Sequence, residues 1–159
     1  MKTFNIWKTI TLGLHNDADS YRSAIKKFGF QISDGANDIL GKSAFTVTPT
    51  KETIDLVVVS VADLGFKNGA TYKEICDAAL NQGLSLVLAE VGPALRLQYK
   101  EGQKGESLYI AMEPISDSDG CLRILDVVYD FGDLWLLTYY GRSHYGWGAG
   151  ARFVFCLRK

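Results

Sequence analysis

The stretch that decides the fold is residues 108–159, LYIAMEPISDSDGCLRILDVVYDFGDLWLLTYYGRSHYGWGAGARFVFCLRK. In residues 108–112, 122–129 and 153–157, one series of apolar side chains alternates with a second series. Because successive side chains of a strand point to opposite faces, this spacing predicts three β-strands. Residues 134–140 are a fourth candidate strand. The segments at 116–120 and 130–133 contain Asp and Gly, which suit tight hairpin turns. The stretch therefore predicts a C-terminal β-meander.

The first half of the chain adds further candidate strands. Alternation predicts strands at residues 4–12 and 95–99, and the β-branched run at 54–61 predicts a strand buried on both faces. Shorter extended segments are expected at 44–47 and 84–89. Residues 90–93 should be irregular, because Pro93 lacks an amide donor and restrains Gly92. Arg96, Gln98 and Tyr99 are then expected to face solvent.

Helix signals also lie in the first half. Asp17 or Asp19 can cap a helix that runs to about Phe28, and Ser33 can cap a short second helix that ends at Gly41. Thr71 and Glu74 form the capping-box pattern before a helix at 72–82. Together these signals predict a single α+β domain, residues 1–159, with an antiparallel or mixed sheet. Two to three helices would pack on one of its faces.

Composition excludes several classes of protein. The chain has 159 residues, is 47% hydrophobic and carries a formal net charge of −1, so it has no global attraction for nucleic acid. It contains no apolar run of membrane-spanning length and no signal-peptide pattern. Cys76, Cys121 and Cys156 are widely spaced, which favours reduced thiols and a cytoplasmic location. With only two histidines, His15 and His144, no metal site or cofactor is predicted.

Several segments resemble parts of short, uncharacterised bacterial proteins. They are GFQISD at 29–34, ANDIL at 36–40, AEVGP at 89–93 with LRL at 95–97, and IAMEPI at 110–115. The resemblance covers nearly the whole chain. It implies a bacterial, cytoplasmic protein and carries no fold, activity or residue roles.

The candidate binding site is the loop at residues 141–150, GRSHYGWGAG. Its alternating glycines favour an unusual backbone. Arg142, His144, Tyr145 and Trp147 include the residue types that dominate binding hot spots, and Tyr139 and Tyr140 could extend the surface. The alternative is that the aromatic side chains fold back over an open face of the sheet.

An enzymatic alternative pairs His144 with a carboxylate for acid–base chemistry. Glu90 and Glu113 each lie near a proline at an expected strand end, where a carboxylate could be held firmly. Asp117 and Asp119 resemble part of a calcium loop, but the spacing fails at the first and last ligand positions, so a hairpin turn is favoured. A helix-turn-helix at residues 17–41 lacks a basic face, so nucleic acid is an unlikely partner.

The sequence thus favours a non-catalytic binding or interaction module that uses the loop at 141–150. Its partner would be a protein or a small-molecule ligand, with no role for a membrane. The alternative is a small enzyme that uses a Glu/His acid–base pair.

Overall fold

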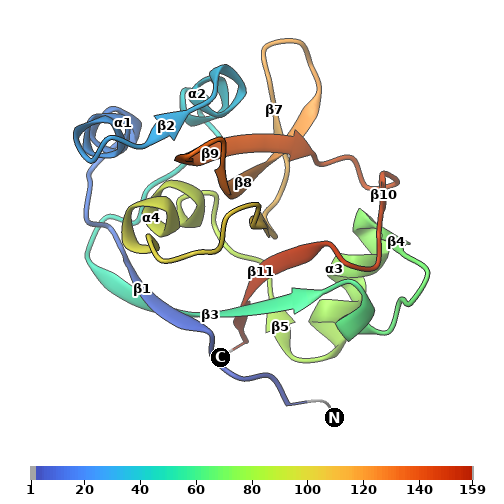
Figure 1. The fold of residues 1–159 in the computed structure, drawn as a ribbon. Helices are drawn as coiled ribbons and strands as arrows, with labels where there is room; N and C mark the ends of the chain where they lie inside the picture. Colours follow the sequence, from blue (N-terminus) through green and yellow to red (C-terminus); the bar gives the residue numbers. More distant parts are fainter. Residues whose placement is uncertain (1–2, 159) are drawn as a thin grey trace.

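The computed structural model describes residues 3–158 and contains four α-helices and one large sheet (Figure 1). The helices are α1 (Ala18–Lys27), α2 (Asp34–Leu40), α3 (Tyr72–Asn81) and α4 (Val91–Gln98), with a short 3-10 helix η1 (Ala62–Leu64). The strands are β1 (Lys8–Leu12), β2 (Gln31–Ile32), β3 (Glu52–Ser60), β4 (Ala70–Thr71), β5 (Leu84–Ser85), β6 (Ser107–Ile110), β7 (Ile115–Ser116), β8 (Leu122–Asp130), β9 (Asp133–Tyr140), β10 (Gly146–Trp147) and β11 (Arg152–Leu157).

The main sheet is mixed, with the strand order β1-β3-β11-β6-β8-β9-β2. The pairs β11–β6 and β2–β9 are parallel, while the other pairs in this order are antiparallel. The predicted α+β class is therefore confirmed. The meander is present as β6, β8 and β9, but it is only part of the sheet, because β11 returns to lie between β3 and β6. β4 and β10 form a separate two-stranded sheet.

The sheet curves around the buried helix α4. In Figure 1, β8 and β9 lie on one side of α4 and β1 lies on the other. Residues 91–97 are all buried. A Cβ atom at Gly92 would lie 2.6 Å from the Leu125 side chain, so only glycine allows this close approach of α4 to β8. The helix thus fills the space within the curve of the sheet.

The predicted strand at residues 95–99 is wrong, because residues 91–98 form α4. Pro93 lies in the first turn of this helix, where a missing amide donor costs nothing. A helix surrounded by protein need not show a 3.6-residue apolar stripe, and here Arg96 and Gln98 alternate with Leu95, Leu97 and Tyr99 as they would in a strand. Arg96 is 1% exposed rather than solvent-facing. It donates hydrogen bonds to the carbonyl groups of Val128, Trp135 and Tyr99.

Helix capping follows the sequence closely. The Asp17 side chain accepts a hydrogen bond from the Ser20 amide, and the Ser33 hydroxyl accepts one from the Ala36 amide. At α3, both hydrogen bonds of the Thr71–Glu74 capping box form. These contacts satisfy amide groups that have no partner within a helix, which is why the boundaries were predictable.

Other boundaries differ from the expectations. Residues 44–47 form no strand, the segment at 84–89 contains only the two-residue β5, and the first strand begins at Lys8. Only the C-terminal half of β3 is buried on both faces. Residues 3–158 contain four α-helices rather than two to three. No helix among residues 3–158 has the length and apolar character needed to cross a membrane.

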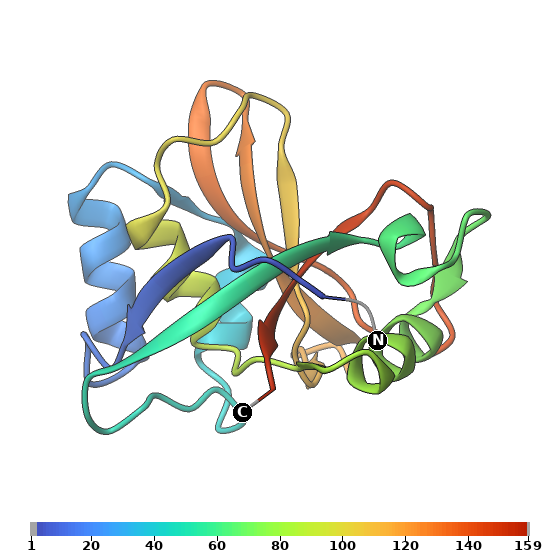
Figure 2. The same cartoon turned by 90° about the horizontal axis from the view of Figure 1, so that it is seen from below.

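The helices do not share one face of the sheet, contrary to expectation. Strand register places Tyr109 and Phe153 on one face, and Leu125 on the other. Tyr72 of α3 packs against Phe153, whereas α4 packs against Leu125. The face that carries Tyr109 and Phe153 is therefore covered by α3 and by the loop at 141–150, which Figure 2 shows at the end of the molecule away from α1.

Candidate functional site

The loop at residues 141–150 is tied to the start of α3. Its residues Gly146 and Trp147 form β10, which pairs with β4. The amide groups of Tyr72 and Lys73 donate to the carbonyl oxygens of Tyr145 and Ser143, at 3.0 and 2.8 Å. The loop is therefore an ordered segment, and its exposed side chains are held in place by main-chain hydrogen bonds.

Trp147 belongs to the hydrophobic core rather than to the surface. Its side chain is 6% exposed and packs against Tyr109, Tyr139, Tyr145 and Phe153, with ring centroids 4.6 to 5.4 Å apart. Its indole N–H group is buried without an acceptor among residues 3–158. Trp147 therefore contributes to the hydrophobic core through the packing of its ring. This part of the loop matches the alternative in which aromatic side chains cover the sheet.

The other predicted loop residues reach the surface. Arg142 and His144 are exposed and Tyr145 is half-buried. Tyr140 is 41% exposed, and its ring centroid lies 5.0 Å from that of Tyr145. The guanidinium groups of Arg123 and Arg142 lie 4.9 and 5.9 Å from the Tyr140 ring, within the range of cation–π attraction. We call Tyr140, Tyr145, Arg142 and His144 the tyrosine–arginine surface.

The tyrosine side chains of this region are connected. The Tyr145 hydroxyl donates to the Tyr139 hydroxyl at 3.5 Å. This hydrogen bond, together with burial, raises the pKa of Tyr139 above its usual value. Tyr139 therefore stays neutral near pH 7, and the region offers aromatic rings and hydroxyl groups rather than phenolate charge.

The structure does not bring Glu90 together with His144. Glu90 is fully buried, and its carboxylate accepts hydrogen bonds from Tyr21, from the Gly13 amide and from both the amide and hydroxyl of Thr48. The Glu90 carboxylate thus accepts four hydrogen bonds in the interior of the fold. Glu90 therefore acts as a structural tie between β1, α1 and the segment before β3.

Glu113 lies closer to the loop. It lines a cavity of about 260 Å³ together with Lys73, Cys76 and Ser143. His144 follows Ser143 in the chain, yet no hydrogen bond or ion pair joins His144 to a carboxylate within residues 3–158. Burial raises the pKa of Cys76 to about 11, so this thiol is not an activated nucleophile.

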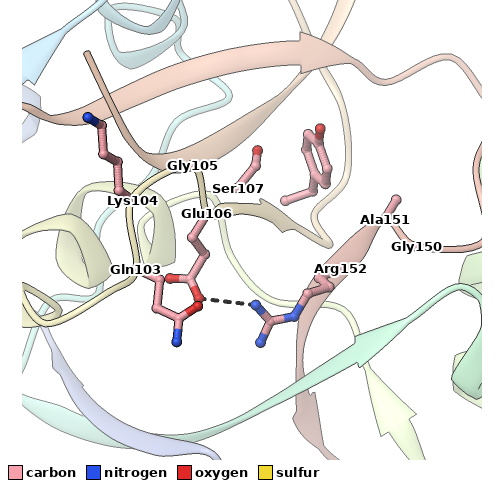
Figure 3. Close-up of a pocket in the computed structure, with 9 residues that line it drawn as sticks. Gln103, Lys104, Gly105, Glu106, Ser107, Gly150, Ala151 and Arg152 are labelled. Atoms are coloured by element: carbon pink, nitrogen blue, oxygen red, sulfur yellow. Dashed lines mark hydrogen bonds and ion pairs between the residues drawn. The ribbon is translucent and has the colours of Figure 1, made fainter. Parts of the chain in front are cut away.

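A polar cavity of about 380 Å³ opens where the loop joins β11 (Figure 3). It is lined by Gln103, Lys104, Gly105, Glu106, Ser107, Tyr109, Gly150, Ala151 and Arg152. The Glu106 carboxylate accepts a hydrogen bond from Tyr99 at 2.6 Å and pairs with Arg152 at 3.1 Å. The charge of Arg152 is thus balanced by Glu106 inside the cavity.

A buried carboxyl group lies behind this cavity. The Ser107 hydroxyl donates to Asp126 at 2.8 Å, and Asp126 is 4% exposed. Burial raises the pKa of Asp126 to about 7. Sequence reasoning missed Asp126, Glu106 and Arg152. The one available signal was Asp126 itself, a carboxylate between the apolar pairs at 124–125 and 127–128.

Within residues 3–158, no group of three or more His, Cys, Asp or Glu side chains is arranged to hold a metal ion. No protein-family model, curated protein or solved structure matches this chain significantly. A function for this chain must therefore be inferred from geometry alone.

Proposed function

We propose that the protein is a non-catalytic binding module whose recognition site is the tyrosine–arginine surface. Tyrosine and arginine are strongly enriched among residues that dominate the energetics of protein interfaces. The observation that carries the proposal is the packing of exposed Tyr140 against Tyr145 and near the guanidinium groups of Arg123 and Arg142. A protein partner fits this chemistry, because rigid aromatic side chains lose little conformational entropy on binding.

The way the loop is held supports the proposal. Trp147 fastens the loop to the core, while the hydrogen bonds from Tyr72 and Lys73 fix the backbone on either side of His144. A surface that is ordered before binding avoids part of the entropic cost of association. The loop thus combines a buried anchor with side chains that remain available to a partner.

The experiment is affinity capture from host lysate with four variants of matched chemistry. Tyr140→Ser and Arg142→Ala remove parts of the tyrosine–arginine surface. The two controls lie at α1. Leu14→Ser removes an exposed apolar side chain before the helix, and Lys27→Ala removes an exposed cation at its last residue. Quantitative mass spectrometry would compare the captured proteins with those of the wild type.

We expect a partner that is captured by the wild type and by both α1-side variants but is lost with Tyr140→Ser and Arg142→Ala. A partner captured equally by all variants would mean that the binding site lies elsewhere on the protein. Circular dichroism and thermal melting of each variant would establish that lost capture is not lost folding.

A further inference from the structure

The turn between β8 and β9 holds an aromatic residue in an unfavourable backbone conformation. Phe131 has a φ angle of +53° and Gly132 one of +77°. Two-residue hairpin turns with two positive φ angles favour Asn, Asp or Gly, because a bulky side chain is strained there. Phe131 is 85% exposed, so its ring contributes almost nothing to folding of the single chain. Strain at an exposed aromatic residue points to a role outside the fold.

A cavity of about 270 Å³ lies directly beside this turn. It is lined by Phe28, Gly29, Phe30, Lys100, Tyr129, Gly132, Asp133 and Leu134. Phe28 is 56% exposed, and its ring stacks on that of Phe30 with centroids 6.0 Å apart. With this volume, the open cavity has room for a phenylalanine side chain against the Phe28 and Phe30 rings, beside the polar groups of Lys100 and Asp133.

We propose that the occupant of this cavity is Phe131 of a second copy of the chain. The projecting ring and the cavity are neighbours on one surface, and Gly132 belongs to both the turn and the cavity wall. A twofold axis passing between them would place each Phe131 in the cavity of the other copy. Such a self-complementary contact closes on itself and forms a dimer rather than a fibre.

One pair of opposite charges can meet across the contact. Asp130 precedes Phe131 in the turn, while Lys100 and Asp133 both line the cavity. Within residues 3–158 Lys100 forms no ion pair, and its ammonium group lies over the Phe28 ring, 4.4 Å from the centroid. In a twofold arrangement Asp130 of one copy can approach Lys100 of the other, which favours this partner and this orientation.

The dimer contact is independent of the proposed recognition site. The β8–β9 turn lies at one end of the hairpin, and Tyr140 lies at the other end of β9. Figure 2 shows the hairpin projecting from the rest of the molecule, beside the segment that precedes β6. Loss of dimer formation should therefore leave capture by the tyrosine–arginine surface unchanged.

The test is sedimentation equilibrium of the full chain over a wide range of concentrations. The wild type should rise from 17.6 kDa toward twice that mass as concentration increases. Phe131→Asn suits the turn, so at a concentration where both proteins are monomeric this variant should unfold at a higher temperature than the wild type. It should nevertheless dimerise about tenfold more weakly or worse. A misfolded protein could not produce that combination.

Charge reversal tests the orientation. Asp130→Lys should weaken the dimer, and adding Lys100→Asp in the same chain should restore it. Leu88→Ser, at an exposed apolar position away from the turn, should leave it unchanged. A wild type that stays at 17.6 kDa at every concentration would overturn the proposal, as would a dimer unaffected by Phe131→Asn.

Discussion

Trp147 packs edge-on against Phe153, with the two ring centroids 4.9 Å apart and the planes at 75°. Phe153 is fully buried in β11, so this contact joins the glycine-rich loop to the centre of the sheet. The neighbouring Tyr145, two residues earlier, stays half-buried at the surface. The loop therefore divides its aromatic residues between a structural anchor and an accessible surface.

Trp147→Ala should destabilise the whole fold. Truncating a buried tryptophan removes its packing and leaves a cavity, at a cost of about 4 kcal/mol. For a chain of this length we expect the melting temperature to fall by about 10 °C. His144→Ala, at an exposed position of the same loop, should change stability by less than about 0.5 kcal/mol. Thermal unfolding of both variants checks this, and equal melting temperatures would contradict the assignment of Trp147 to the core.

Glu90→Gln should destabilise the fold far more than Glu113→Gln. The Glu90 carboxylate accepts from four donors, and an amide would turn its NH₂ group toward two of them. Leaving buried donors unpaired should cost about 3 kcal/mol. Glu113 is exposed, so the same substitution there is a matched control. Urea unfolding of the two variants measures the difference, and similar losses would show that Glu90 is not a structural tie.

Asp126 should make stability depend on pH. Its folded pKa is raised to about 7 from the ordinary 3.8, so the folded state holds the proton more tightly than the unfolded state. The stabilising contribution is complete below about pH 4 and is lost as pH rises toward 7. A shift of this size corresponds to at most about 4 kcal/mol.

Asp126→Asn isolates this effect. The amide oxygen can still accept the hydrogen bond from Ser107, but the side chain no longer titrates. Relative to the wild type, the variant should gain stability steadily between pH 4 and pH 8 in urea unfolding. Other titrating groups cancel in this comparison. A stability difference that stays constant with pH would refute the raised pKa.

Local signals made much of the fold predictable. The caps at Asp17, Ser33 and Thr71 satisfy amide groups within a few residues, so the helix starts can be predicted from short segments of sequence. The strands of the meander show the two-residue alternation of a strand, although β8 is buried on both faces from Ile124 to Val128. In contrast, α4 is surrounded by protein, and its environment comes from β1, β8 and β9, which lie far away in the sequence. Burial on several sides removed the helical stripe, and the alternation of Leu95, Leu97 and Tyr99 with Arg96 and Gln98 gave the spacing of a strand instead.

The candidate site was predictable only in part. The residue types of the loop indicated a binding surface, but the burial of Trp147 depends on Tyr109 and Phe153, which other strands supply. The pairing of Arg152 with Glu106 joins residues 46 positions apart. Such contacts depend on strand order, and strand order is set by the parallel return of β11 beside β6.

The measurement that tests the central claim most directly is site-specific photo-crosslinking in the host cell. A photoreactive amino acid would replace His144, and in a second protein it would replace Lys27 of α1. Both side chains are exposed, so neither replacement should disturb the fold. We predict that position 144 yields a defined crosslinked protein, which position 27 does not, and that Tyr140→Ser abolishes it. No crosslink at position 144, or the same products at both positions, would contradict a recognition site at the tyrosine–arginine surface.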